Sequence, residues 1–163
     1  MDIHILTTGG TIEGIDYESE VNKTKSNTLI KHFLELANVN FKYTIESVFQ
    51  KDSRAITDED RRLLADTLKS SKASKILITH GTYTMEDTAK YIGKLNLNKT
   101  IVLVGSFLLG SSKNTDAPFN LGFAISTLGF LKSGVYIAMN GQMFDWYNVT
   151  KNLETNKFEQ SDD

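Results

Sequence analysis

Cysteine is absent from the 163 residues, and proline occurs once. The first absence excludes disulfide bonds and thiolate metal sites, and the second leaves no proline-rich linker that could divide the chain. No apolar run approaches the roughly 20 residues needed to cross a bilayer. The opening MDIHILTT lacks the basic and apolar regions of a secretory signal. We therefore expect one domain in the cytoplasm.

A strong charge of either sign is also lacking. The formal net charge is −2 and the pI is about 5.9, which gives no sign of the strongly basic face typical of nucleic-acid binding. Hydrophobic residues make up 40% of the chain, close to the norm for globular proteins, so a sizeable core is expected. We predict neither a nucleic-acid partner nor a membrane partner.

Short apolar runs alternate with longer segments of helical period. Alternation of this kind predicts crossover units and a parallel sheet, and continuous apolar strands predict burial on both faces. The fold class is therefore α/β: a three-layer α-β-α domain with a mostly parallel sheet of about five strands, of flavodoxin or Rossmann type. Strands are expected at 3–8, 41–49, 75–79, 100–105 and 134–140, and helices at 28–38, 61–71, 84–95 and 119–131. Residues 1–151 would form this single domain, and 152–163 a polar tail whose composition is compatible with disorder.

Three polar loops follow three of these strands. They read TTGGTIEG, HGTYTMED and GSFLLGSSKNTDAP. Ligands of open parallel sheets bind at the carboxyl ends of the strands, near a switch in strand order, and helix N-termini there favour anionic groups. We expect the functional site at this edge.

The first loop allows two interpretations. Gly9 and Gly10 permit backbone angles closed to other residues and let a ligand approach closely. The hydroxyls around them, such as that of Thr11, either cap a turn or take part in chemistry. A phosphate loop is disfavoured, because the glycine spacing and the Gly-Lys-Ser/Thr ending are both missing.

The second loop has a similar composition. Gly81 opens a turn, and Thr82 or Thr84 could cap the helix that follows. His80 is expected to be a packed, hydrogen-bonded histidine, because the other two histidines, His4 and His32, offer no metal-ligand spacing to it. We predict no metal site and no cofactor.

Three further stretches are interpreted structurally. Asp116 and Pro118 fit a helix cap followed by proline in the first turn. Thr57 fits an N-cap followed by acids in the first turn. Trp146 and Tyr147 are expected to serve packing.

TTGGTI near the N-terminus and ITHGTYTMEDTA some seventy residues later resemble the two signatures of the bacterial-type L-asparaginases. Further similarity runs through KDSRAITDEDR, IVLVGS, TDAPFNLGFA and MNGQMFDWYNVTK. The resemblance extends over residues 3–151. It covers only the larger N-terminal domain of that family, whose members are considerably longer.

The resemblance implies an amidohydrolase that converts the side-chain amide of L-asparagine, or a related amide, to acid and ammonia through an acyl-enzyme. In the implied catalytic set, Thr11 matches the threonine nucleophile. Thr82 matches the threonine of the second motif, and Lys151 matches the lysine that supports it. Tyr17 is the candidate for the tyrosine of a mobile loop, which would be the segment 13–25 acting as a lid.

The resemblance also implies substrate contacts. Ser53 matches a position that binds the substrate carboxylate. Gly10 and Gly81 bring backbone N–H groups to the substrate, and such groups can hold a developing oxyanion. A threonine hydroxyl needs a neighbour to take its proton, and a lysine serves only where its pKa is lowered. A relay from Lys151 through Thr82 would meet this need.

Two departures from the family pattern affect this expectation. Tyr83 stands where the family has an aspartate that holds the substrate ammonium, so one negative charge is missing. Lys151 then loses a partner that favours its protonated form, which should lower its pKa, while binding of free asparagine should weaken. The bulkier ring could also fill the amino-acid pocket.

The second departure is length. The family site is completed by the smaller C-terminal domain of a neighbouring subunit. We expect a homo-oligomer, dimer or tetramer, or a separate partner that supplies this domain. The alternative function is a binding module for amino acids or dicarboxylates, or an interaction subunit, that has lost the reaction.

Overall fold

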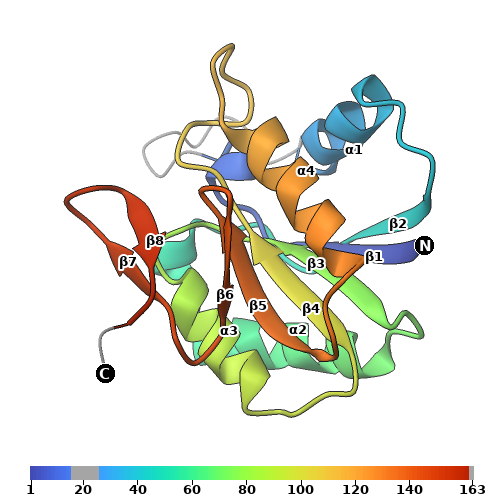
Figure 1. Ribbon diagram of the computed structural model, residues 1–163, viewed down its shortest axis with the longest axis vertical. Coiled ribbons are helices and arrows are strands. Elements are labelled where there is room, and N and C mark those ends of the chain that lie inside the picture. Colours follow the sequence, from blue (N-terminus) through green and yellow to red (C-terminus); the bar gives the residue numbers. More distant parts are fainter. Residues whose placement is uncertain (16–25, 162–163) are drawn as a thin grey trace.

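A six-stranded sheet lies at the centre of the structure, with helices on both of its faces (Figure 1). The computed structural model describes residues 1–15 and 26–161. The strands of the sheet are β1 (Asp2–Thr7), β2 (Lys42–Ser47), β3 (Lys75–Thr79), β4 (Thr100–Val104), β5 (Gly134–Met139) and β6 (Gln142–Asp145). Two further strands, β7 (Thr150–Asn152) and β8 (Lys157–Glu159), form a separate antiparallel pair.

The strand order is β2-β1-β3-β4-β5-β6, and every neighbouring pair is parallel except β5 and β6. The prediction of a three-layer α/β domain with a mostly parallel sheet is confirmed. Because β2 lies on one side of β1 and β3 on the other, the strand order reverses between β1 and β3. This is the place where such sheets open a crevice for a ligand.

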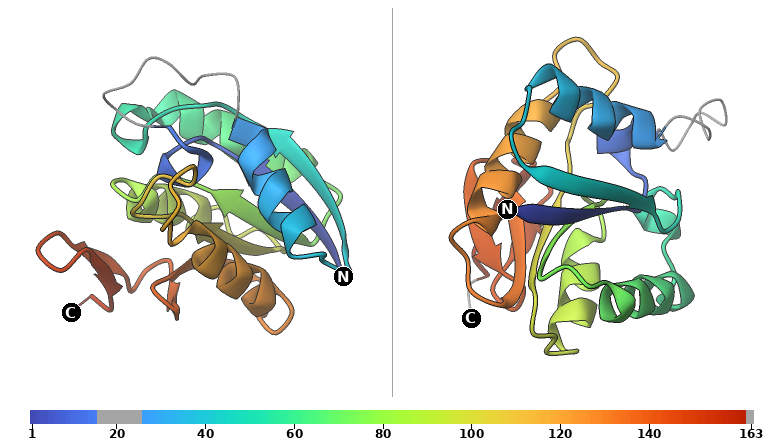
Figure 2. Two further views of the ribbon diagram at one scale, coloured as in Figure 1. Left: turned by 90° about the horizontal axis from the view of Figure 1, so that it is seen from above. Right: turned by 90° about the vertical axis from the view of Figure 1, so that its right-hand side faces the viewer.

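Four α-helices of the described part of the chain form the outer layers. Figure 2 shows α1 (Ser26–Leu36) and α4 (Ala117–Leu128) on one face, and α2 (Asp58–Ser70) and α3 (Met85–Gly93) on the other. The central strands are therefore buried from both sides, and Ile101, Val102 and Leu103 of β4 have no exposed surface. This double coverage explains why those strands read as unbroken apolar runs. Within the described ranges, no helix is long and apolar enough to span a membrane.

The start of α2 is set by a capping box, which confirms the prediction of Thr57 as its N-cap. The Thr57 hydroxyl accepts a hydrogen bond from the Asp60 N–H at 3.3 Å, and the Asp60 carboxylate accepts one from the Thr57 N–H at 2.8 Å. Reciprocal bonds of this kind satisfy two backbone donors that a helix start otherwise leaves free. The helix consequently begins at Asp58, as an N-cap at Thr57 requires, so that the acids Asp58, Glu59 and Asp60 form its first turn.

Thr84 and Asp116 occupy the predicted N-cap positions of α3 and α4, and Pro118 lies in the first turn of α4, but neither cap side chain bonds to its helix. The Thr84 side chain makes no cap hydrogen bond, and its hydroxyl donates instead to the Ser53 carbonyl at 2.7 Å. The Asp116 side chain does not cap α4 either; its carboxylate accepts from the N–H groups of Phe107 and Leu108 at 3.0 and 2.9 Å. Both side chains therefore hold neighbouring loops in place.

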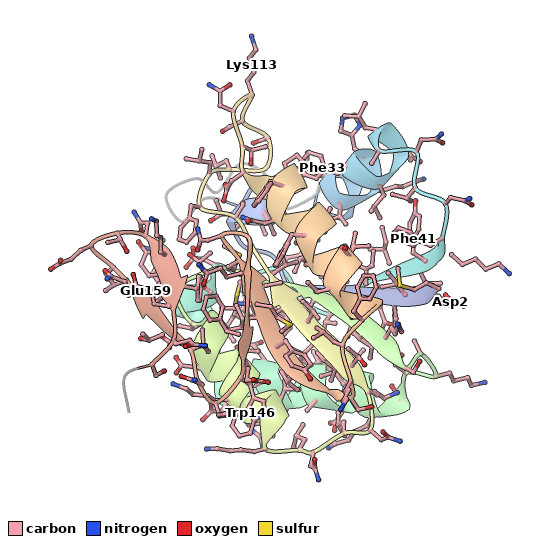
Figure 3. The ribbon with its side chains drawn as sticks, viewed as in Figure 1. Asp2, Phe33, Phe41, Lys113, Trp146 and Glu159 are labelled. Atoms are coloured by element: carbon pink, nitrogen blue, oxygen red, sulfur yellow. The ribbon has the colours of Figure 1, made fainter. Side chains whose placement is uncertain are left out.

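The segment after β5 contains strands that the sequence did not predict. Asn140 and Gly141 both have positive φ, 55° and 72°, which fits a two-residue hairpin turn and pairs β6 with β5. Trp146 packs on α3 as expected, where a Cβ added to Gly93 would meet its ring at 2.2 Å (Figure 3). Tyr147 packs edge-on against the Trp146 ring but is largely exposed.

The β7–β8 hairpin stands beside the main sheet (Figure 1). It is anchored by Phe158, which is 2% exposed and lies 6.3 Å from the Phe107 ring, centre to centre. The expected division of the chain after residue 151 falls within β7. That division stays a prediction, and the described part of the expected tail contains β8.

Candidate active site

The two glycine turns touch each other directly at the reversal in strand order. Gly10 has φ 81°, and a Cβ added to it would lie 2.5 Å from the Gly81 nitrogen. A Cβ on Gly81 would in turn lie 2.7 Å from the Ser53 Oγ. No side chain fits at either position, because backbone and a buried serine occupy the space. The turns after β1 and β3 therefore form one packed unit.

Thr11 follows directly on this contact. It opens the short 3-10 helix Thr11–Glu13, and its carbonyl accepts from the N–H groups of Gly14 and Gly110, each at 2.9 Å. The second of these bonds ties Thr11 to the loop between β4 and α4. Figure 3 shows Lys113 at the tip of that loop, pointing away from the protein.

A pocket of about 330 Å³ opens beside Thr11. It brings together residues from the segments that follow β1, β2, β3 and β4. Its lining consists of Thr11, Ile15, Asp52, Arg54, Tyr83, Phe107, Leu108, Leu109 and Ser112. Thr11 and Tyr83, from the two signature motifs, thus face one space.

A larger pocket, of about 660 Å³, lies at the opposite edge of the sheet. Its lining includes Asp2 and His4 of β1 and Lys75 of β3, at or near the amino ends of those strands. Parallel sheets bind their ligands at the other edge, and neither signature motif contributes to this pocket. We therefore place the candidate site at Thr11.

Thr82 and Lys151 meet at the second turn. Thr82 is 5% exposed, and the Lys151 Nζ donates to its Oγ1 at 2.9 Å. The lysine comes from β7, 69 residues further along the chain. Burial, and secondly the charge of Arg54, lower the pKa of Lys151 below its ordinary value, while Glu86 acts in the opposite direction. A lowered pKa makes a neutral amine accessible nearer to neutral pH.

The Tyr83 ring lies next to two cations. Its centre is 4.1 Å from the Lys151 Nζ and 4.6 Å from the Arg54 Cζ, both within cation–π range. The ring is 53% exposed and lines the pocket without closing it. Tyr83 therefore shapes the wall of the pocket and the electrostatic surroundings of Lys151.

Ser53 is 1% exposed and holds the second turn. Its Oγ accepts from the Tyr83 N–H at 3.1 Å, and its carbonyl accepts from the Thr84 hydroxyl. Asp52 and Arg54, on either side of Ser53 in the sequence, line the pocket. Ser53 itself is not among the lining residues. Its predicted contact with a substrate carboxylate stays a prediction.

Asp52 and Arg54 form an ion pair on the pocket wall. The Arg54 Nε and Nη2 donate to the two carboxylate oxygens of Asp52 at 2.9 and 3.2 Å. Burial tends to raise the pKa of Asp52, but the hydrogen bonds and charge of Arg54 outweigh it, so the pKa lies below its usual value. The carboxylate is thus ionised and engaged by the guanidinium.

Asp52, Arg54 and Phe107 were missed by the sequence interpretation. The stretch KDSRAIT was noticed for its serine alone, although its alternation of charges around Ser53 was visible. Phe107 belongs to the loop after β4, whose apolar composition gave no chemical signal. Its position depends on the Asp116 carboxylate, a long-range contact that spacing does not reveal.

The expected lid, the segment 13–25 with Tyr17, is only partly described by the structure. Tyr17 and most of the segment 13–25 lie outside the described residues, so the expected lid stays a prediction. Glu13, at the start of that segment, is 3% exposed, and its Oε1 accepts from the Thr79 hydroxyl at 2.6 Å. Among the described residues, no group of three or more His, Asp or Glu side chains is placed to hold a metal ion.

His80 is fully buried between the turn and α3, in agreement with its interpretation as a packed histidine. Its Nδ1 lies 2.7 Å from the Gly81 carbonyl oxygen and its Nε2 lies 2.9 Å from the Thr88 hydroxyl. Burial lowers the pKa of His80 to about 4, although the hydrogen bond with the Gly81 carbonyl acts to raise it. The imidazole is therefore neutral near pH 7.

We expect His80 to make the fold sensitive to acid. Between pH 6.5 and 4 the unfolded chain binds a proton at this histidine and the folded chain does not. As the pH is lowered from 6.5 to 4, the free energy of unfolding therefore decreases by about 3 kcal/mol in total. Urea unfolding at pH 7 and pH 4 measures the loss, and His80→Gln should lose about that much less than the wild type. Equal losses in both proteins would contradict this assignment.

Comparisons with known proteins extend these observations. The family model "Asparaginase, N-terminal" matches residues 2–160. The chain is 34% identical to a glutaminase-asparaginase of Acinetobacter glutaminasificans, over 96% of this chain and 52% of that protein. It is also 34% identical to a probable periplasmic L-asparaginase of Haemophilus influenzae, over 94% of this chain and 47% of that protein.

Solved structures give the same result. The structure of a probable cytoplasmic L-asparaginase from Campylobacter jejuni superposes with a TM-score of 0.79 at 28% identity, covering 97% of this chain and 52% of that one. The chain spans about half the length of the relatives it matches. Because those relatives are named for both compartments, the cytoplasmic location stays a prediction.

Proposed function

The chain belongs to the asparaginase family, and we propose that it is the nucleophile-bearing domain of an amidohydrolase acting on a primary side-chain amide, such as that of L-asparagine. One observation carries the proposal. The Nζ of Lys151 reaches the Oγ1 of Thr82 at 2.9 Å, beside the glycine turn that presents Thr11 to a pocket. A hydroxyl and an amine of lowered pKa are thereby joined next to Tyr83, which lines the pocket.

The proposed reaction proceeds in two steps. The Thr11 Oγ attacks the amide carbon while its proton passes through the Thr82 hydroxyl to the Lys151 amine. The C–N bond then breaks as the amide nitrogen takes that proton back and leaves as ammonia. A water molecule next attacks the resulting ester. The acid is released and the Thr11 hydroxyl is restored, so that one water is consumed for each ammonia formed. Two easier steps thus replace one difficult step.

The glycine turns would supply the electrostatic part of catalysis. The lack of a Cβ at Gly10 and Gly81 lets the two turns pack directly against each other, and backbone N–H groups of these turns would face the substrate. In well-studied hydrolases, one such donor to the oxyanion contributes roughly 3–4 kcal/mol to transition-state stabilisation. Ser53 would fix the turn, and Tyr17 would belong to the segment that covers the site.

The assembly is part of the proposal. Since the chain spans about half the length of its relatives, residues outside it would complete the site. A homo-oligomer, or a separate chain resembling the C-terminal domain, would bring them to the open side of the pocket. The expected substrate is a small amide, without nucleic acid or membrane contact.

Ammonia release is the direct test. We expect turnover of at least one small primary amide, and kcat/KM should rise with pH until Lys151 is neutral, below the ordinary lysine pKa of 10.5. The sign follows from the role of the lysine, because only the neutral amine accepts a proton. A coupled ammonia assay from pH 6 to 10 measures both. Folded protein that releases no ammonia from asparagine, glutamine or their derivatives would overturn the proposal.

One observation favours a binding module instead. The Lys151 Nζ lies 4.1 Å from the Tyr83 ring centre, and a cation–π contact stabilises the protonated amine, which opposes a role as base. A binding module would show saturable ligand binding without product. The same ammonia assay, combined with calorimetry, separates the two functions.

A further inference from the structure

The charges around the pocket are unequal. Arg54 lines it, and Lys151 reaches its Phe107 and Tyr83 walls at 5.3 and 4.1 Å from the ring centres. Asp52 is the single carboxylate among the lining residues that the structure describes. In the described wall Arg54 and Asp52 balance each other, and the Lys151 amine behind the aromatic rings adds a positive charge that Glu86 partly offsets.

The one carboxylate is not available to a ligand cation. Both of its oxygens accept from the Arg54 side chain, and Oδ1 also accepts from the Arg54 backbone N–H at 2.9 Å. A ligand ammonium would have to displace a guanidinium held at two points. Two-point pairs between arginine and a carboxylate are among the stronger ionic contacts in proteins.

The aromatic wall is also occupied. An exposed tyrosine ring can itself bind an ammonium group over its face. The Tyr83 ring, however, already has a guanidinium at 4.6 Å and an amine at 4.1 Å. A third positive charge at this ring would be repelled by both of them.

We propose that this pocket selects ligands with a carboxylate next to the reacting group and without an ammonium group. The substrate class would be half-amides of dicarboxylic acids, such as succinamate, together with amides whose amino group is acylated. Turnover of these amides rests on the proposed function, whereas the binding preference does not depend on it. Hydrolysis of succinamate with one water gives succinate and ammonia.

The test uses the products, because they bind without turnover. Succinate and L-aspartate differ only by the ammonium group, and L-malate carries an uncharged hydroxyl in its place. Calorimetry on the 163-residue chain at pH 7.5 should give at least about ten-fold tighter binding of succinate than of L-aspartate, the effect of roughly one unfavourable charge contact. L-Malate should bind like succinate. Malate as weak as aspartate would indicate a steric cause and overturn the inference.

Two variants assign the preference to Tyr83. Tyr83→Asp adds a carboxylate between the two cations and should reverse the order, so that L-aspartate binds more tightly than succinate. Tyr83→Phe keeps the ring and should keep the wild-type order. The half-exposed side chain makes both substitutions compatible with folding, and the wild-type comparison decides the matter even without them.

The outcomes for the binding preference and for the reaction are separate. Equal binding of succinate and aspartate, tighter aspartate, or no saturable binding of either would overturn the preference, whatever the turnover. A preference for succinate, with no ammonia formed from succinamate or asparagine, would support it while rejecting the amidohydrolase.

Discussion

Thr11→Ala is expected to lower kcat for amide hydrolysis by at least about 10⁴-fold, to the level that binding and the oxyanion donors alone sustain. The reason is that no acyl-enzyme can form without the Oγ atom. Initial rates of ammonia release, measured with the amide that the wild type turns over fastest, test this expectation. The protein itself should remain folded, because the contacts of Thr11 to Gly14 and Gly110 are made by its backbone.

Thr11→Ser is the matched control. It keeps a hydroxyl at the same position and loses one methyl group, so most of the activity should remain. Urea unfolding should place both variants within about 0.5 kcal/mol of the wild type, the usual range away from structural features. A Thr11→Ala protein that retains wild-type turnover would remove the threonine from the mechanism.

Lys151→Arg is expected to lower kcat/KM by about 10² to 10⁴-fold, the usual contribution of one group in general acid–base catalysis. The substitution keeps the positive charge and the possibility of a contact with the Tyr83 ring. It removes the ability to take a proton, because the guanidinium does not deprotonate in proteins. The pH profile is the specific readout, since the rise of kcat/KM that reports the neutral lysine should disappear.

Lys151→Met completes the comparison. It removes both the charge and the base while retaining a side chain that can cover Phe107. If the amine acts as a base, the two variants should be similarly slow. An Arg variant near the wild-type rate, beside an inactive Met variant, would show that the lysine contributes through its charge.

The sheet could be predicted from the sequence because its strands are buried on both faces. The runs KILIT and TIVLVG have no polar alternation, which is the mark of a covered parallel strand. The same criterion failed for β6, β7 and β8, which are short and largely exposed. Asn140-Gly141 did carry the hairpin signal, but no strand was predicted after it.

The candidate site was predicted unevenly for a physical reason. Thr11, Thr82 and Lys151 were identified through motifs, and the structure places the last two within hydrogen-bond distance. The wall of the pocket could not be identified in this way. Arg54 reaches Tyr83 across 29 residues of sequence, and the loop of Phe107 is held by a carboxylate nine residues ahead. Contacts of this kind depend on tertiary packing, which spacing along the chain does not encode.

The position of Lys151 on a small hairpin beside the main sheet has a consequence for the newly made protein. A ribosome releases the chain from its N-terminus onward, so β1 to β6, both glycine turns and the pocket emerge before residue 150. A nascent chain of that length could assemble its sheet and present Thr11, yet it would lack the amine on which the proposed relay depends. Reactivity would then arise only as the last hairpin docks, with Phe158 as its anchor.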